Sequence, residues 1–362
     1  MPEHSLSASR RGVVVLAMVL AAFVLGSGVR RLLTGRHVDE AAVLPQTREF
    51  PVFGTYARLT FWAPSPVASK ALDQVTDELL ALHRTLNLFD PESELARLNA
   101  SAAEAPFVCS PELWDVLGAA RRAWRDTDGL FDVSIGPLMR LWGFHGKRST
   151  LPDAAEIAAA RARVGLNLVA FADDERSVRF NKPGMYLDFG GIAKGYALDR
   201  AAAIAARGGI RSGLIDLGGN VRCLAEPPPG HEAYVIGIRD PFETDTLLGT
   251  VEILDGAVAT SGNYETFVKI EGRVLHHIVD PRNGEPVPDV AGVTVIATAG
   301  VDSDVYSTAV FVGGTAVIVR LLETHPGTRV LRIRGAGAQD RRTESFAWKW
   351  LEAPAAPRPV RD

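Results

Sequence analysis

The residues best suited to chemistry lie in short polar clusters between apolar segments. The first cluster contains Asp188, Gly190, Gly191 and Lys194. Adjacent glycines let the backbone approach a ligand closely, and a helix that begins just after them offers free N–H groups to an anion. We therefore expect a strand, a tight loop and a helix that together resemble a phosphate-binding loop. Because the cluster fits neither of the common glycine-rich nucleotide-binding patterns, a structural turn capped by Asp188 is an equal alternative.

A second cluster places Asp304 and Thr308 one helical turn apart at the expected start of a helix. Residues at this spacing lie on the same helix face. A carboxylate and a hydroxyl supply the oxygen ligands that Mg²⁺ prefers, and Mg²⁺ usually shares its ligands with a phosphate. Taken alone, N-capping by Asp302 or Ser303 is the stronger interpretation of this cluster.

The adjacent residues His276 and His277 precede a turn at 280–284. In a strand they point to opposite faces and do not easily bind one metal together. A histidine that faces a pocket can transfer protons near neutral pH, although a lone histidine is more often structural. Two polar turns accompany this cluster, a double glycine after a strand at 216–220 and a group of small hydroxyl residues at 259–264.

The composition limits the class of protein. The chain has 362 residues, 47% of them hydrophobic, with a formal net charge of -4. Without a basic excess it is not expected to bind nucleic acid in general. Cys109 and Cys223 fit no zinc site and leave one disulfide open.

The N-terminal region, 1–35, is expected to be a signal peptide or a membrane anchor. An apolar run at 12–29 lies between the pairs Arg10-Arg11 and Arg30-Arg31. The first pair loosely resembles a twin-arginine signal, whereas the length of the run favours an anchor. Either interpretation places the rest of the chain on the extracytoplasmic side, exported or attached to the membrane by this segment. Residues 36–48 are expected to be a linker, 49–350 the folded domain and 351–362 a disordered tail.

The elements that must position these clusters alternate irregularly, which favours a single α+β domain over a doubly wound one. Periodic apolar residues predict helices at 67–86, 111–124, 154–164, 194–207 and 303–322. Strands are expected at 52–62, 292–299 and 330–333, with shorter ones between 214 and 258.

In their order along the chain, the clusters resemble the ApbE family of FAD:protein FMN transferases, also called flavin transferases. The resemblance spans about residues 50 to 335. It rests on the segments 188–197, 216–220, 260–264, 277–284 and 304–309, with further likeness at 53–55, 89–95, 131–138 and 142–144. Phe53 stands where the family usually has Met, Phe89 where Tyr is usual, and Asn283 where Thr is common.

The resemblance implies a T-fold-related α+β domain that uses Mg²⁺ to transfer FMN from FAD to a Ser or Thr hydroxyl of a target protein, with release of AMP. Targets in the family belong to membrane electron-transfer systems. It implies that Asp304, Thr308 and a backbone carbonyl near Gly191 bind the metal, and that His277 assists proton transfer. The implied FAD site comprises Phe53, Phe89, Leu130, Phe131, Asp132, Asp188, Lys194 and Ile278.

Two other functions agree with the same residues. In the first, water replaces the acceptor, and the protein is a Mg²⁺-dependent pyrophosphatase that cleaves FAD to FMN and AMP. In the second, the protein binds FAD without catalysis and assists assembly of a membrane redox system. A metal beside the pyrophosphate argues against the second function, because mere binding does not require it.

Overall fold

The structure is a computed structural model that describes residues 44–243, 245–264 and 266–352. The predicted signal or anchor (1–35), most of the predicted linker and residues 353–362 of the predicted tail lie outside this range. Within it, no helix combines the length and the apolar character needed to span a bilayer.

The main sheet has antiparallel strands throughout. Its eight strands lie in the spatial order β1 (Gln46–Val52), β2 (Thr55–Trp62), β6 (Ser212–Leu217), β7 (Asn220–Cys223), β10 (Gly256–Gly262), β13 (Val290–Ala297), β14 (Arg329–Arg334) and β15 (Arg342–Phe346). Smaller sheets are formed by β3 (Phe107–Val108), β5 (Ser177–Phe180) and β4 (Val169–Ala172), by β8 (Tyr234–Arg239) and β9 (Leu247–Ile253), and by β11 (Phe267–Ile270) and β12 (Arg273–His276).

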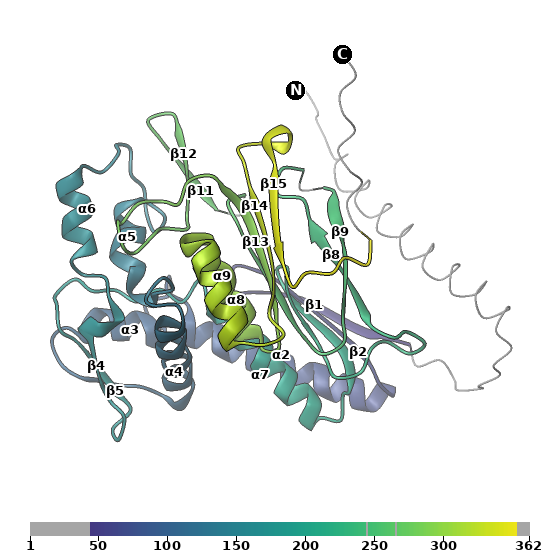
Figure 1. Ribbon diagram of the computed structural model, residues 1–362. Coiled ribbons are helices and arrows are strands. Elements are labelled where there is room, and N and C mark those ends of the chain that lie inside the picture. The colour runs from purple at the N-terminus through teal and green to yellow at the C-terminus, as the bar shows by residue number, and fades with distance from the viewer. Residues whose placement is uncertain (1–43, 244, 265, 353–362) are drawn as a thin grey trace, which may run out of the picture. The chain divides into compact units, whose positions relative to one another are not determined.

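Helices accompany the strands in mixed order, which confirms the predicted α+β class (Figure 1). They are α2 (Ser65–Leu86), α3 (Glu94–Ser101), α4 (Pro111–Asp126), α5 (Gly136–Leu141), α6 (Ala154–Arg161), α7 (Ala193–Arg207), α8 (Gly300–Gly313) and α9 (Thr315–Thr324). Single 3₁₀ turns are η1 (Val133–Ile135), η2 (Leu166–Leu168) and η3 (Ala338–Asp340).

The ordered domain extends beyond both predicted limits, 49 and 350. Strand β1 begins at Gln46 because it pairs with β2, with Gln46 opposite Phe61. At the other end, the backbone N–H of Leu351 donates to Thr250 of β9, and Thr250 donates back to Glu352. These backbone hydrogen bonds order residues that composition alone assigned to a linker and a tail.

The main sheet is covered on both faces, so its inner strand β13 is apolar except for Thr294. Strand β13 is buried along its whole length. Its residues Val293 and Val295 belong to the larger core, which α2, α7 and α8 share, whereas Ala291 and Ile296 belong to a second core with β8 and β9. A strand buried on both sides reads as a continuous hydrophobic run rather than an alternation.

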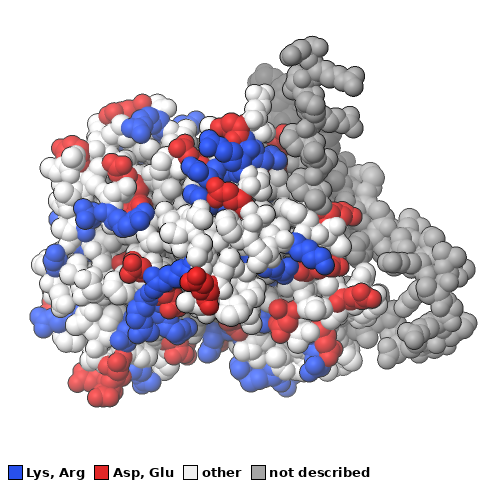
Figure 2. All heavy atoms as spheres, viewed as in Figure 1, with Lys and Arg blue, Asp and Glu red and all other residues white. Residues whose placement is uncertain are grey.

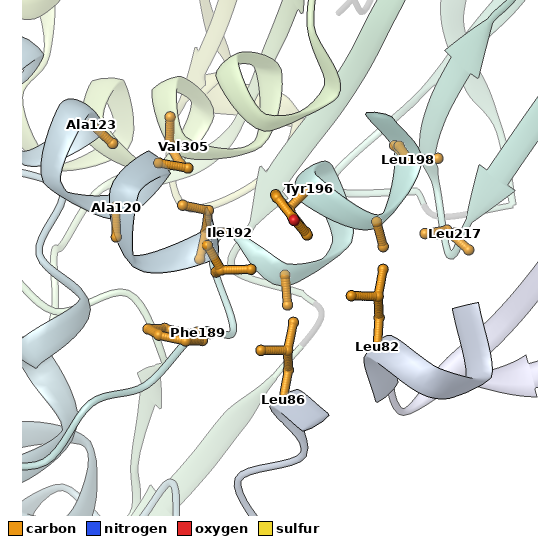
Figure 3. Close-up of a cluster of buried hydrophobic side chains, with 14 of the residues drawn as sticks. Leu82, Leu86, Ala120, Ala123, Phe189, Ile192, Tyr196, Leu198, Leu217 and Val305 are labelled. Carbon is orange, nitrogen blue, oxygen red and sulfur yellow. The ribbon is translucent and has the colours of Figure 1, made fainter. Parts of the chain in front are cut away.

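The larger core joins α7 to its neighbours. Leu82 and Leu86 of α2 point toward α7, and Tyr196 and Leu198 of α7 lie in the same cluster (Figure 3). Val305 of α8 packs in this cluster too (Figure 3). The helix that follows the double glycine is therefore fixed by apolar contacts on several sides.

The surface carries both signs of charge. On the face in Figure 2, acidic and basic side chains of the described residues are interspersed rather than gathered into one field. This distribution agrees with the small formal net charge of -4.

Two expectations from the sequence are corrected, and the structure answers a question that the sequence left open, whether the two cysteines pair. The strand expected before Gly190 is absent from the described sheets: Leu187 pairs instead with the side-chain amide of Asn99, through bonds of 2.7 and 2.9 Å. The helix expected at 303–322 is two helices, because Gly314 adopts a φ of 62° and ends α8. Cys109 and Cys223 are both free and buried, and burial raises the pKa of each thiol to about 12.

Helices α7 and α8 cross at two glycines. A Cβ added to Gly195 would lie 2.5 Å from the backbone oxygen of Gly300 and 2.6 Å from Cβ of Asp304. Likewise, a Cβ on Gly300 would lie 2.6 Å from the backbone oxygen of Gly195. Real Cβ atoms do not approach backbone this closely, so the crossing requires glycine at both positions.

We expect Gly195→Ala to destabilise the protein by about 2–3 kcal/mol, because the added methyl group overpacks the crossing. Gly118→Ala is the matched control: Gly118 lies inside α4 with open space around the added Cβ. It should stabilise the helix by about 0.5–1 kcal/mol. Urea unfolding measures both variants. Wild-type stability of Gly195→Ala would contradict the close crossing.

Candidate functional site

A cavity of about 710 Å³ brings the predicted site residues together. Every residue that the sequence assigned to metal, flavin or proton transfer lines it: Phe53, Phe89, Leu130, Phe131, Asp132, Asp188, Gly191, Lys194, His277, Ile278, Asp304 and Thr308. The resemblance therefore selected residues that are far apart in sequence and adjacent in space.

Asp304 is a buried carboxylate on α8. Its Oδ2 accepts a 2.8 Å hydrogen bond from the backbone N–H of Gly195, and its Oδ1 accepts one of 2.9 Å from the side-chain amide of Asn220. Burial raises the pKa of the Asp304 carboxyl, and the positive charge of Lys194 opposes that shift. Both groups that donate to Asp304 are neutral, so its ionised carboxylate has no opposite charge in direct contact. These two hydrogen bonds also leave some of its lone pairs free.

Thr308 lies one turn further along α8, beside the loop that precedes α7. Its hydroxyl is 3.2 Å from that of Ser261 on β10. A Cβ on Gly191 would lie 3.5 Å from the Thr308 Oγ1. The carboxylate of Asp304, the hydroxyl of Thr308 and the backbone at Gly191 thus lie at the same cavity.

Lys194 lies in the first turn of α7, where the free N–H groups also present positive charge. A lysine here adds to the helix dipole instead of offsetting it, which is unfavourable until an anion binds. The charge of Lys194 reaches two cavity groups, since it acts on the pKa values of both Asp304 and His277.

His277 follows β12 and is half-buried at the cavity. Its Nδ1 lies 3.2 Å from the backbone oxygen of Thr266. Since a carbonyl only accepts, Nδ1 carries the proton and Nε2 is the free acceptor. Burial lowers the pKa of His277, and the positive charge of Lys194 lowers it further, while the Thr266 bond opposes both. The imidazole is therefore held in its neutral, proton-accepting form.

Asp188 pairs with a histidine that the sequence did not point to. His145 Nε2 lies 3.0 Å from Asp188 Oδ2, and the two side chains are 8% and 12% exposed. The other Asp188 oxygen accepts from the backbone N–H of Gly190 at 2.7 Å. His145 also meets the Phe89 ring edge-on, with centroids 5.6 Å apart. Both carboxylate oxygens of Asp188 are thereby fixed in direction.

Phe53 occupies the tip of the β1–β2 hairpin. It adopts a φ of 51° and Gly54 a φ of 71°, a left-handed pair typical of two-residue hairpin turns. A non-glycine residue in this region is uncommon. Its ring packs edge-on against His83, with centroids 5.5 Å apart. The turn directs an aromatic side chain to the rim of the cavity.

The donor set fits a hard cation better than a zinc-type ion. Among the residues that the structure describes, no group of three His, Cys, Asp or Glu side chains could hold a metal. One carboxylate, one hydroxyl and a backbone carbonyl instead suit Mg²⁺ that completes its shell with water and substrate phosphate.

The comparison with protein families decides what kind of chain this is. The family described as "ApbE family" matches residues 53–331. That range is most of the 362-residue chain.

The chain belongs to the ApbE family. It is 36% identical over 239 residues to the FAD:protein FMN transferase of Klebsiella pneumoniae (strain 342), a match that covers 65% of this chain and 71% of the relative. It is 33% identical to that of Rhodobacter capsulatus, with 91% of this chain covered but 62% of the relative. The crystal structure of the ApbE protein of Thermotoga maritima superposes with a TM-score of 0.76 and 30% identity, covering 84% and 97% of the two chains. The resemblance read from the motifs is confirmed.

Two polar residues of this ApbE domain were missed as parts of the site. Asn220 was noted only as part of a turn, yet its amide holds Asp304. His145 follows the segment 142–144, but nothing in its spacing connects it to Asp188. Partners of this kind depend on tertiary contacts between separate segments, which sequence periodicity does not report.

Asp132 lines the cavity, and its carboxylate also holds neighbouring segments of the protein. Its carboxylate accepts four hydrogen bonds within the protein, from Trp124 Nε1 at 2.9 Å, from the Ser134 backbone at 2.8 Å and hydroxyl at 2.6 Å, and from the Leu166 backbone at 3.0 Å. Burial raises the pKa of Asp132, and these bonds oppose the shift. The side chain therefore fastens the cavity wall through its bonds to Trp124, Ser134 and Leu166.

We expect Asp132→Ala to lower the free energy of unfolding by about 2–4 kcal/mol, because buried donors lose their acceptor. Asp173→Ala, which removes the exposed ion pair with Arg121, should change it by about 0.5 kcal/mol or less. Urea unfolding of both variants tests this. Equal stabilities would show that the four bonds do not support the wall.

Proposed function

We propose that this protein is a Mg²⁺-dependent FAD:protein FMN transferase that moves FMN from FAD to a Ser or Thr hydroxyl of a partner flavoprotein. The observation that carries the proposal is the convergence of Asp304, Thr308, Lys194 and His277 on one cavity. Membership in the ApbE family and the names of the relatives support FAD as donor and a protein as acceptor.

In this transfer each bond that forms is matched by one that breaks, and the residues of the cavity can accept the proton that is released. The acceptor hydroxyl oxygen bonds to the phosphorus of the FMN half, the bond from that phosphorus to the AMP oxygen breaks, and AMP leaves. His277 accepts the hydroxyl proton at Nε2, since Nδ1 is engaged by Thr266. Lys194 and the N-terminus of α7 stabilise the negative charge of the pyrophosphate. No covalent bond to the enzyme is needed.

Asp304, Thr308 and the backbone at Gly191 would hold the metal. The buried Asp304 carboxylate fits a cation, because its direct hydrogen-bond partners are neutral and its ionised form is costly without a counter-charge. When bound, Mg²⁺ supplies Lewis-acid stabilisation of the pyrophosphate charge.

We also propose that the domain acts on the extracytoplasmic side of a membrane, on an acceptor of an electron-transfer system. The support is the apolar run at 12–29 between two arginine pairs, a segment outside the described residues.

Incubation with FAD, Mg²⁺ and a candidate acceptor domain tests the reaction. Flavin that stays with the denatured acceptor, matched by an equal amount of AMP, supports transfer. An acceptor whose Ser or Thr is replaced by Ala should stay unlabelled. Free FMN and AMP without labelled acceptor would instead indicate the pyrophosphatase, and intact FAD a binding protein.

We expect Asp304→Asn to lower Mg²⁺-dependent transfer by about a hundredfold or more, because the charged ligand is lost. The fold should keep its stability to within about 1 kcal/mol, since a flipped Asn220 amide can restore both hydrogen bonds. Asp302→Asn, on the same turn but away from the cavity lining, is the matched control. Steady-state turnover in a Mg²⁺ titration measures the effect. Wild-type turnover in Asp304→Asn would overturn the metal assignment.

We expect the transfer rate to fall in acid with a midpoint below 6.5, the ordinary pKa of histidine, because burial lowers the pKa of His277. The neutral base is present above the lowered pKa and is lost as pH falls through it. His277→Ala should remove this limb and slow transfer by about 10²-fold or more, whereas His231→Ala, on an exposed loop, should keep the wild-type profile. An unchanged acid limb in His277→Ala would assign the proton to another group.

A further inference from the structure

The helix that carries both metal-binding candidates is capped by a residue of another helix. Ala299 precedes α8 and supplies no side-chain cap. Instead, Asp199 of α7 accepts hydrogen bonds from the backbone N–H groups of Gly300 at 2.6 Å and Val301 at 2.9 Å. Two of the free N–H groups at the start of α8 are therefore bound to one carboxylate of α7.

Asp199 makes the second of two contacts that join the same faces of α7 and α8. Gly195 and Asp199 lie one turn apart on α7, and Gly300 and Asp304 lie one turn apart on α8. Gly195 donates to Asp304, while Asp199 accepts from Gly300. Two contacts a turn apart fix how far α8 is advanced along α7, which a single contact does not.

We propose that Asp199 is a positioning residue of the transferase: it sets α8 against α7 so that Asp304 and Thr308 face the backbone at Gly191. This inference rests on the proposed function, because it concerns the metal that this wall would hold. Asp199 itself does not line the cavity, so its effect is transmitted through α8.

A purely stabilising cap is the competing explanation, and the two differ in what they change. A loss of capping alone lowers stability by about 0.5–2 kcal/mol and leaves metal affinity as it was. A shift of α8 alters the separation of the oxygen ligands. Loss of such outer support lowers metal affinity by about 10–100-fold.

The test compares Asp199→Ala and Asp199→Asn with Asp153→Ala. Asp153 also caps a helix through its carboxylate, with a 2.8 Å bond from the Glu156 N–H, but it is the N-cap residue of that helix, α6, and lies outside the cavity lining. Binding of Mn²⁺ to the full chain with saturating FAD and no acceptor is followed by electron paramagnetic resonance. Urea unfolding reports stability.

We expect Asp199→Ala to weaken Mn²⁺ binding by about tenfold or more, and Asp199→Asn, which keeps one acceptor oxygen, by less. Asp153→Ala should lose comparable stability with Mn²⁺ binding unchanged. If Asp199→Ala binds Mn²⁺ with wild-type affinity, this inference is wrong, while the proposed function still stands. Absence of Mn²⁺ binding by the wild-type protein would instead overturn the proposed metal, and this inference with it.

Discussion

The crossing of α7 and α8 without intervening side chains is the constraint on which the rest of the site depends. Gly195 and Gly300 let the two backbones touch, and only then can the Asp304 carboxylate reach the N–H of Gly195. A wider separation would leave that buried carboxylate without its backbone donor, which costs more than the hydrogen bond itself contributes. The double glycine before α7 and the polar start of α8 therefore act as one unit, although the chain between them forms four of the eight strands of the main sheet.

The same crossing holds two unfavourable charges near each other. Lys194 adds positive charge where the α7 dipole is already positive, and Asp304 carries a negative charge in a buried position. Each charge makes the other less unfavourable in this position, because the positive charge of Lys194 opposes the rise that burial causes in the pKa of Asp304. Among the described residues neither forms an ion pair with an opposite charge, which supports the proposal that an anionic substrate and a cation bind beside them. Sites with unbalanced charges of this kind are often functional.

The sequence predicted the elements that follow local rules and missed those fixed by distant partners. The helix at 67–86 follows from apolar spacing, and α2 confirms it. By contrast, Leu187 looked like part of a strand because the segment before the double glycine is apolar, but Asn99 supplies its backbone partners. The break at Gly314 was hidden because the apolar residues continue across it. At the site, ordered motifs identified the lining residues, while His145 has no local signal that connects it to Asp188.

Hydrogen-bond partners distinguish two buried carboxylates, Asp132, which the resemblance assigned to the FAD site, and Asp304, which it assigned to the metal. Asp132 accepts from Trp124, Ser134 and Leu166 through both oxygens, which uses the acceptor capacity of a carboxylate. Asp304 accepts only two bonds within the described residues, from Gly195 and Asn220. Its remaining lone pairs are free for a cation. A carboxylate in a family motif can thus either hold the cavity wall together or remain available to bind a cation. The number of hydrogen bonds that it accepts from the protein distinguishes these two roles.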